Sequence, residues 1–428
     1  MTSKQVLRAE GDNLRRKLLS DNWYFNLTFF LLLIAAASLP FTTWLMPIIA
    51  GLMLIVWIAE WNWKEKWQNI RKNASIYTIV VFFAIYLILI YGFFLSYNKG
   101  RAFAAFDCGM WFLAAPLLLL TRNRKNLTNS RIHMIFMVFA ISTFVHLFIL
   151  FSIATHKFIQ TGKSHYFYYQ YLSIWLHPSY LAMYATFSFY FLLDFLNKTH
   201  KMMSWIQRLS LYFVQAVLLF GVFFLQSKAG IIVFCILAII WFVYLLFIRN
   251  TDIALALSII VSVSCICIVL HETQIFPTNR FKATIEDVSK YRNEQNHGTS
   301  SSELRLTAWR STLEICKKNL PWGVGTGDVI DELSLNAVKK NHTNLIGYHL
   351  NSHNQYLQTL LALGIPGILV LIAYCIHPLI VGGRKKNLLY ISFAIILILN
   401  IGVESMFDVR AGVDFIALMN VLLLMRTT

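Results

Sequence analysis

The sequence is poor in charged residues for its length. Only 13% of its 428 residues are Asp, Glu, Lys or Arg, about half the share that a soluble domain usually carries. Hydrophobic residues make up 57% of the chain, and the mean hydropathy is +0.59. This composition excludes an ordinary soluble enzyme and indicates a membrane protein.

Cysteines are also few, and the usual metal motifs are missing. Cys316 alone lies among polar residues, so the soluble parts cannot build a disulfide framework. The sequence contains neither CxxC nor HExxH, so we predict no metal site and no cofactor. The other five cysteines fall inside apolar stretches: Cys108, Cys235, Cys265, Cys267 and Cys375.

Apolar runs long enough to cross a bilayer, about 17 to 25 residues, fill most of the chain. We predict an all-α polytopic membrane protein with about twelve transmembrane helices and one large helical loop between spans nine and ten. The predicted domains are a membrane bundle over 1–270, the loop over 271–351 and a second membrane bundle over 352–428. The spans are expected near 24–39, 45–58, 76–95, 103–120, 132–154, 179–196, 209–225, 229–248, 253–270, 357–381, 388–403 and 413–425.

The net charge of +17 can be interpreted once the Lys and Arg residues are assigned to the two sides of the membrane. With an even number of spans, 21 of the 37 Lys and Arg residues lie on the side of both termini, whereas the other side has six outside the long loop and ten within it. Cytoplasmic connections gather Lys and Arg, so both termini are predicted to be cytoplasmic. The charge then faces anionic headgroups of the phospholipid bilayer and does not indicate nucleic acid.

The 81 residues of 271–351 far exceed the ~12 to 15 above which a loop is usually functional or disordered. A capping box at 300–303 precedes a helix that Gly323, Gly325 and Gly327 end. A second capping box, Ser352 with Gln355, is expected to start the helix of span ten. The apolar face of the loop helix is expected to contain Leu306, Trp309, Leu313, Cys316 and Leu320.

An enzyme on the outer face has no ATP and needs a substrate that arrives activated, such as a polyprenyl diphosphate-linked sugar. Lys228 lies between two apolar runs, where a charge is costly unless an anion approaches; a lysine that reaches to interfacial water is the alternative. Arg305 opens the loop helix one turn before Trp309, and its alternative is a solvated surface arginine.

His353 is the candidate general base. In the first turn of a helix it would feel the positive end of the helix dipole, which disfavours imidazolium and keeps the ring a proton acceptor. The same helix start attracts anions such as diphosphate. A histidine that only hydrogen-bonds at the interface is the alternative reading, and His349 is a rival base.

Three other patterns carry less chemical information. The run from Pro321 to Gly327 follows a helix and has no GK[ST], so it indicates a turn rather than a nucleotide loop. The aromatic segment 165–171, with Trp175 and His177, is typical of an interface belt or of a surface that stacks on sugar or lipid. Charged residues at the outer end of the last two spans are either functional or paired with one another: Glu404, Asp408, Arg410 and Asp414.

The order of motifs in one outer loop resembles the O-antigen ligase superfamily. The motifs are Arg305-Leu-Thr-Ala-Trp309, Pro321-Trp-Gly-Val-Gly-Thr-Gly327, Ser352-His-Asn-Gln-Tyr-Leu357 and Leu363-Gly-Ile-Pro-Gly367. The resemblance implies transfer of a glycan from an undecaprenyl diphosphate-linked donor to the lipid A-core acceptor at the periplasmic face of the bacterial inner membrane, with inversion and without a metal.

The resemblance also implies residue roles. His353 matches the essential histidine of the family and Arg305 its diphosphate-binding arginine. Lys228 stands where the family commonly has arginine, so it keeps the charge but gives up bidentate phosphate contact. The candidate substrate-binding residues are Trp309, Asn354, Tyr356, His349 and Arg410.

Other functions stay open. Protein O-oligosaccharyltransferases and O-antigen or exopolysaccharide polymerases use the same donor. Because the sequence ends after its last span, we expect no soluble C-terminal domain of the kind that many protein glycosylators carry, which favours the ligase. A transporter of lipid-linked sugars is the alternative from another class. It would require paired, interrupted helices and an internal repeat, neither of which the sequence shows.

Overall fold

The computed structural model describes residues 21–248, 301–340 and 351–427, and all regular structure in these ranges is helical. The predicted ninth span, 253–270, lies outside the described residues. The helices up to the first gap are α2 (Asp21–Ser38), α3 (Leu45–Ala59), α4 (Trp63–Asn73), α5 (Ile76–Leu95), α6 (Lys99–Cys108), α7 (Met110–Leu120), α8 (Asn129–Thr161), η1 (Ser164–Phe167), α9 (Tyr169–Leu172), α10 (Pro178–Thr199), η2 (His200–Met202), α11 (Trp205–Phe224), α12 (Lys228–Val243) and the π-helical turn η3 (Tyr244–Ile248). They are followed by α15 (Ser301–Asn319), α16 (Val329–Lys339), α17 (Gln355–Arg384), α18 (Leu388–Ile401), η5 (Met406–Asp408) and α19 (Arg410–Thr427).

Among the described residues, seven helices are long and apolar enough to cross a membrane. An eighth results if α3 and α4, which meet at a bend of 118°, form one span. The helices α2 and α18 are apolar but shorter, and α19, with Arg410, Asp414 and Arg426, is not among the seven. The all-helical membrane fold is therefore confirmed, and the count of twelve spans stays a prediction.

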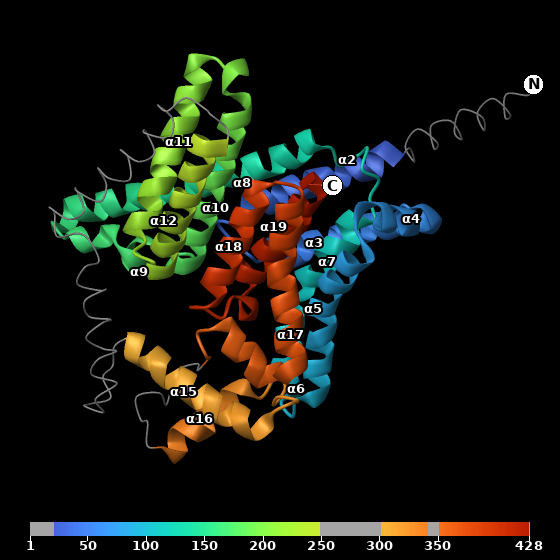
Figure 1. The fold of residues 1–428 in the computed structure, drawn as a ribbon. Coiled ribbons are helices and arrows are strands. Elements are labelled where there is room, and N and C mark those ends of the chain that lie inside the picture. Colours follow the sequence, from blue (N-terminus) through green and yellow to red (C-terminus); the bar gives the residue numbers. More distant parts are fainter. Residues whose placement is uncertain (1–20, 249–300, 341–350, 428) are drawn as a thin grey trace, which may run out of the picture.

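Two helices form the centre of the bundle. Nearly every residue of α10 and of α19 is buried, around the whole circumference of each helix. A helix that is buried on all sides belongs inside a bundle rather than on its surface. The helix α19 packs against α7 and α18, and α10 packs against α8, α11 and α18. The other spans surround this core (Figure 1).

The two helices of the long loop, α15 and α16, lie together at one end of the bundle, and the C-terminal end of α19 lies at the other (Figure 1). The predicted apolar face of α15 is wrong for Leu313 and Leu320, which are 46% and 42% exposed. The buried stripe is rotated and contains small and polar side chains, because α15 packs against α17 and α16 through close contacts. It consists of Ala308, Ser311, Thr312, Ile315 and Cys316.

The helix α17 is interrupted near its start, which the sequence analysis did not predict. Gly364 has φ 64° and ψ −152°, a conformation that is essentially restricted to glycine. The interruption, together with Pro366, leaves the carbonyls of Leu361 and Ala362 without their helical donors. They accept instead from the backbone N–H groups of the glycine run, at 2.9 and 2.8 Å.

The glycine run therefore docks onto the interrupted helix. Val324 and Gly325 supply the two N–H groups, and the carbonyl of Pro321 accepts from the N–H of Ile365 at 2.8 Å. A Cβ on Gly364 would lie 2.0 Å from that carbonyl oxygen, so only glycine fits. This pairing fixes the end of α15 against the first part of α17.

The same run also reaches the turn between α5 and α6. The carboxylate of Asp328 accepts from the backbone N–H groups of Tyr97 and Asn98 at 2.6 and 2.7 Å. The hydroxyl of Ser96 accepts from the N–H of Gly327 at 2.8 Å. Loop, interrupted helix and α5–α6 turn thus form one hydrogen-bonded layer at this end of the bundle.

Candidate active site

Glu404, in the turn after α18, joins two residues that the sequence analysis selected separately. Its Oε1 lies 3.0 Å from Nδ1 of His353, and its Oε2 lies 3.1 Å from Nη2 of Arg305. Glu404 is 8% exposed, so water screens these contacts little. We call these three residues the His353–Glu404–Arg305 cluster.

The packing of α15 onto α17 determines where Arg305 lies. Thr312, two turns after Arg305 on the buried stripe, has its Oγ1 3.0 Å from the Oγ of Ser352. The hydroxyl and backbone N–H of Ser352 both donate to Oε1 of Gln358, at 3.0 and 3.1 Å. The fully buried Ser352 thus connects the loop helix with the start of α17 and brings Arg305 to Glu404.

The predicted capping box at Ser352 and Gln355 is wrong. The residue that caps α17 is Asn354, whose Oδ1 accepts from the N–H groups of Tyr356 and Leu357 at 3.0 and 3.2 Å. His353 therefore precedes the helix and does not lie in its first turn. Its backbone is left-handed, with φ 43°, and its N–H donates to Oδ1 of Asn351 at 2.9 Å.

The contact between Glu404 and Nδ1 determines the tautomer of His353. An ionised Glu404 accepts a proton-bearing nitrogen, so the tautomer with N–H at Nδ1 leaves Nε2 as a proton acceptor. Burial alone would raise the pKa of Glu404, but its hydrogen bond with His353 and the charge of Arg305 lower it below the ordinary value. Glu404 is therefore a carboxylate at neutral pH and orients both partners.

His177 also belongs to this end of the bundle. It caps α10, with Nδ1 accepting from the N–H of Ser179 at 3.4 Å, and its pKa is lowered mainly by burial. The charges of Glu404, Arg305 and His353 all act on it, which places it near the cluster. The sequence analysis assigned His177 only to the aromatic segment.

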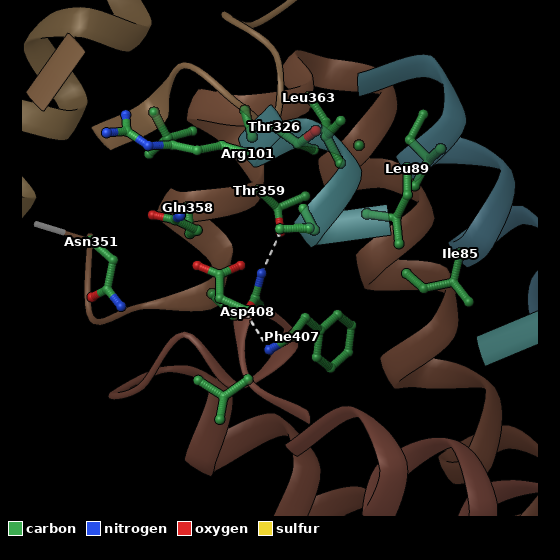
Figure 2. Close-up of a pocket in the computed structure, with 18 of the residues that line it drawn as sticks. Ile85, Leu89, Arg101, Thr326, Asn351, Gln358, Thr359, Leu363, Phe407 and Asp408 are labelled. Atoms are coloured by element: carbon green, nitrogen blue, oxygen red, sulfur yellow. Dashed lines mark hydrogen bonds between the residues drawn. The ribbon is translucent and has the colours of Figure 1, made fainter. Parts of the chain in front are cut away.

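A cavity of about 350 Å³ lies beside the cluster, between α5, α6, α7, α16 and α17. Figure 2 shows Gln358 and Asp408 close together with Asn351 to one side, and Ile85 and Leu89 across the cavity. One end is therefore polar and the rest of the wall is largely apolar.

Asp408 is the ionisable group at the polar end of the cavity. Its side chain is exposed within the cavity. Burial under the surrounding protein raises the pKa of Asp408 to about 7; the hydrogen bond from Gln358 opposes this rise and the charge of Glu404 adds to it. The surrounding protein thus favours the neutral carboxyl form of Asp408.

The remaining candidates are distributed around this end. Lys228 is the first residue of α12, after its N-cap Ser227, and this turn packs against α10 near Ala182. Trp309 is half-buried on α15, one turn after Arg305, and its buried indole N–H has no acceptor within the described ranges. His349 lies outside the described residues.

Two candidates have structural contacts. The side chain of Asn354 caps α17, and the hydroxyl of Tyr356 donates to the carbonyl of Ile398 at 3.1 Å, so both hold the start of α17 in place. We therefore do not include them in the proposed substrate contacts.

The charged residues after α18 do not pair among themselves. Glu404 belongs to the cluster and Asp408 faces the cavity, whereas Arg410 forms an ion pair with Asp107 of α6. Asp414 is fully buried in α19, and neither of its carboxyl oxygens has a hydrogen-bond donor within the described part of the chain. Sequence proximity at the end of a span therefore did not predict their partners.

The orienting role of Glu404 was the main omission of the sequence analysis. Glu404 is 51 residues from His353 and 99 from Arg305, and no spacing links them. The available signal was a carboxylate at the end of an otherwise apolar span. Among the described residues, no group of three or more His, Cys, Asp or Glu side chains could hold a metal ion.

Comparison with known proteins agrees with the motifs. A comparison with curated proteins finds no match. Residues 213–372 match the family model described as O-Antigen ligase, and this range contains Lys228, Arg305 and His353. The apolar helices make the chain a multi-pass membrane protein, and the family indicates glycosyl transfer of the ligase or polymerase type. The match of residues 213–372 to the O-antigen ligase family therefore supports the resemblance that the motifs indicated.

Proposed function

We propose that the protein transfers a glycan from undecaprenyl diphosphate to the lipid A-core of lipopolysaccharide, at the periplasmic face of the bacterial inner membrane. The observation that carries the proposal is the His353–Glu404–Arg305 cluster. It joins His353 and Arg305, which both lie within the matched residues 213–372, through the buried carboxylate of Glu404, which lies outside that range.

In the proposed reaction, a hydroxyl oxygen of the acceptor attacks the anomeric carbon of the donor glycan. The new carbon–oxygen bond forms as the bond from that carbon to the diphosphate oxygen breaks, with inversion. Nε2 of His353 takes the hydroxyl proton, and general base catalysis of this kind contributes about 10² to 10⁴ in rate. Glu404 holds the ring in the required tautomer and stabilises the imidazolium that forms.

Arg305 and Lys228 are the proposed partners of the leaving diphosphate. Arginine can bind phosphate oxygens in a bidentate manner, whereas lysine provides a compact positive charge. Charges that are already in place where negative charge develops are often the largest contribution to catalysis. Arg305 is partly exposed, at 30% of its side chain, so a substrate can reach it although Glu404 holds it.

The direct test uses purified protein in nanodiscs with an undecaprenyl diphosphate-linked glycan and lipid A-core, with products identified by mass spectrometry. His353→Ala should abolish transfer while the protein stays folded. His156→Ala is the matched control, because His156 is exposed on α8 and its ring contacts Gln160 of the same helix. Transfer by His353→Ala at the parent rate would contradict the assignment.

The acceptor requires its own test. A pilin-like peptide and a second lipid-linked repeat should be offered beside lipid A-core, because protein glycosylators and polymerases use the same donor. The proposal requires lipid A-core to be the preferred acceptor. Flux of the lipid-linked glycan across vesicles without any acceptor would instead support a transporter.

A further inference from the structure

The cavity beside the cluster differs chemically from a diphosphate site. Among the described residues that line it, the only cation is Arg101, which forms an ion pair with Asp331 of α16. Neither Arg305 nor Lys228 is among those residues. A doubly charged phosphate group would therefore find no unpaired positive charge there and would meet the carboxyl group of Asp408.

The polar end of the cavity suits hydroxyl groups. Asp408 offers carboxyl oxygens, Asn351 and Gln358 offer amides, and Thr359 offers a hydroxyl. A carboxylate or amide oxygen accepts from a sugar hydroxyl, and an amide N–H donates to one. The opposite wall, with Ile85 and Leu89 (Figure 2), suits the C–H face of a sugar ring.

The size of the cavity is sufficient for a sugar ring. At about 30 Å³ for each water-sized group, 350 Å³ accommodates roughly a dozen such groups, which corresponds to about one sugar ring. The cavity therefore has room for a terminal sugar of a ligand.

The cavity also ends close to the proposed base. Asn351, which lines it, accepts the backbone N–H of His353 at 2.9 Å. Gln358, at the same end, accepts from both Ser352 groups and also hydrogen-bonds Asp408. A sugar ring with its hydroxyls against Asp408 and Gln358 would therefore lie directly beside the segment that carries His353.

We propose that this cavity is the acceptor subsite, which binds the uncharged terminal sugar of the acceptor glycolipid with Asp408 accepting from one of its hydroxyls. The proposal rests on the proposed glycosyl transfer and extends it. It separates the two substrates: the diphosphate of the donor lies at Arg305 and Lys228, and the acceptor sugar lies between α5, α6 and α17. Asp408 is then a residue that determines acceptor specificity.

The test is to fill the cavity and measure each substrate separately. Ala105→Trp places a large side chain in the cavity, and Phe103→Trp is the matched control, because Phe103 is on the same helix and 61% exposed. In the transfer assay, Ala105→Trp should raise the KM for lipid A-core at least about tenfold and leave the KM for the undecaprenyl diphosphate-linked donor unchanged. A raised donor KM with an unchanged acceptor KM would assign the cavity to the donor and overturn the proposal, as would no change in either.

Two further measurements keep the outcome decisive. Should Ala105→Trp fail to fold, Ala105→Leu and the isosteric Asp408→Asn carry the same comparison, with Asp408→Asn expected to raise the acceptor KM about tenfold. Binding of lipid A-core to parent and variants is also measured by native mass spectrometry, without donor. If the parent binds lipid A-core but transfers no glycan to it, the proposed function is refuted, and binding by the cavity variants still tests the subsite. Equal binding of lipid A-core by parent and cavity variants would refute the subsite.

Discussion

Replacing Glu404 by Gln removes one charge from the His353–Glu404–Arg305 cluster and keeps the size of the side chain. In the parent, the two carboxylate oxygens contact His353 and Arg305 at 3.0 and 3.1 Å. A glutamine has one acceptor oxygen and one NH₂ group, so whichever way the amide turns, it presents N–H groups to one of the two partners. In one orientation the amide N–H groups face the Arg305 guanidinium and that contact is lost. In the other they donate to Nδ1 of His353, which then carries its proton on Nε2 and cannot act as the base.

The magnitude follows from the burial of the carboxylate. A hydrogen bond to a charged group contributes about 1.5 to 3 kcal/mol, and Glu404 is only 8% exposed, so little of this is screened. At about 1.4 kcal/mol for each tenfold change in rate, the loss of the bond that orients His353 lowers kcat about 10- to 100-fold. The effect should be smaller than that of His353→Ala, about 10² to 10⁴.

The assay is steady-state glycan transfer in nanodiscs, with kcat and the donor KM measured for parent, Glu404→Gln, His353→Ala and the double variant. Because Glu404 is a positioning residue that acts through His353, the double variant should be hardly slower than His353→Ala. Glu332→Gln, on α16 and outside the cluster, is the control for the loss of one carboxylate. Parent activity in Glu404→Gln, or effects that multiply in the double variant, would refute the reasoning.

Three further predictions concern Gly364, the pKa of Asp408 and the ion pair between Arg410 and Asp107. Gly364→Ala should lower the stability of the hydrogen-bonded layer by at least about 1 to 3 kcal/mol, from backbone strain alone. This should be seen as a lower Tm and faster proteolysis between α15 and α16. Gly383→Ala is the control and should behave as the parent, because a Cβ at Gly383 meets nothing within 4 Å. Burial raises the pKa of Asp408 to about 7 in the folded state. Between pH of about 4 and about 7 the folded state therefore keeps a proton on Asp408 that the unfolded chain has released. The free energy of unfolding should then fall as pH rises through this range. Thermal unfolding at several pH values should show this slope in the parent and not in Asp408→Asn. If Arg410 only holds α19 to α6, then Asp107→Asn and Arg410→Gln should have the same small effect, about 0 to 1 kcal/mol in stability; a raised donor KM in Arg410→Gln alone would instead support its role in substrate binding.

Much of the site could be predicted residue by residue, but its connections could not. His353 and Arg305 were selected from the chemistry of a loop and from a family resemblance, and the structure brings them together. The prediction of the second capping box was wrong because Ser352 and Asn354 are both good N-cap residues. In the structure the hydroxyl of Ser352 donates to Gln358, and Asn354 caps α17. Leu313 and Leu320 were expected to pack because of their helical spacing. They are exposed, because spacing alone does not determine which face of a helix its neighbours cover.

The sequence by itself determined that the protein is a multi-pass helical membrane protein, and it predicted the end of the bundle at which its chemistry lies and the residue types that carry it. Long apolar runs and the distribution of Lys and Arg depend on local composition, which acts without regard to packing. Only the tertiary structure decided that Glu404 joins His353 to Arg305, that the glycine run satisfies the carbonyls of an interrupted α17, and that a cavity ends beside Asn351. Each of these depends on contacts between residues far apart in the chain, and such contacts exist only once the helices have packed.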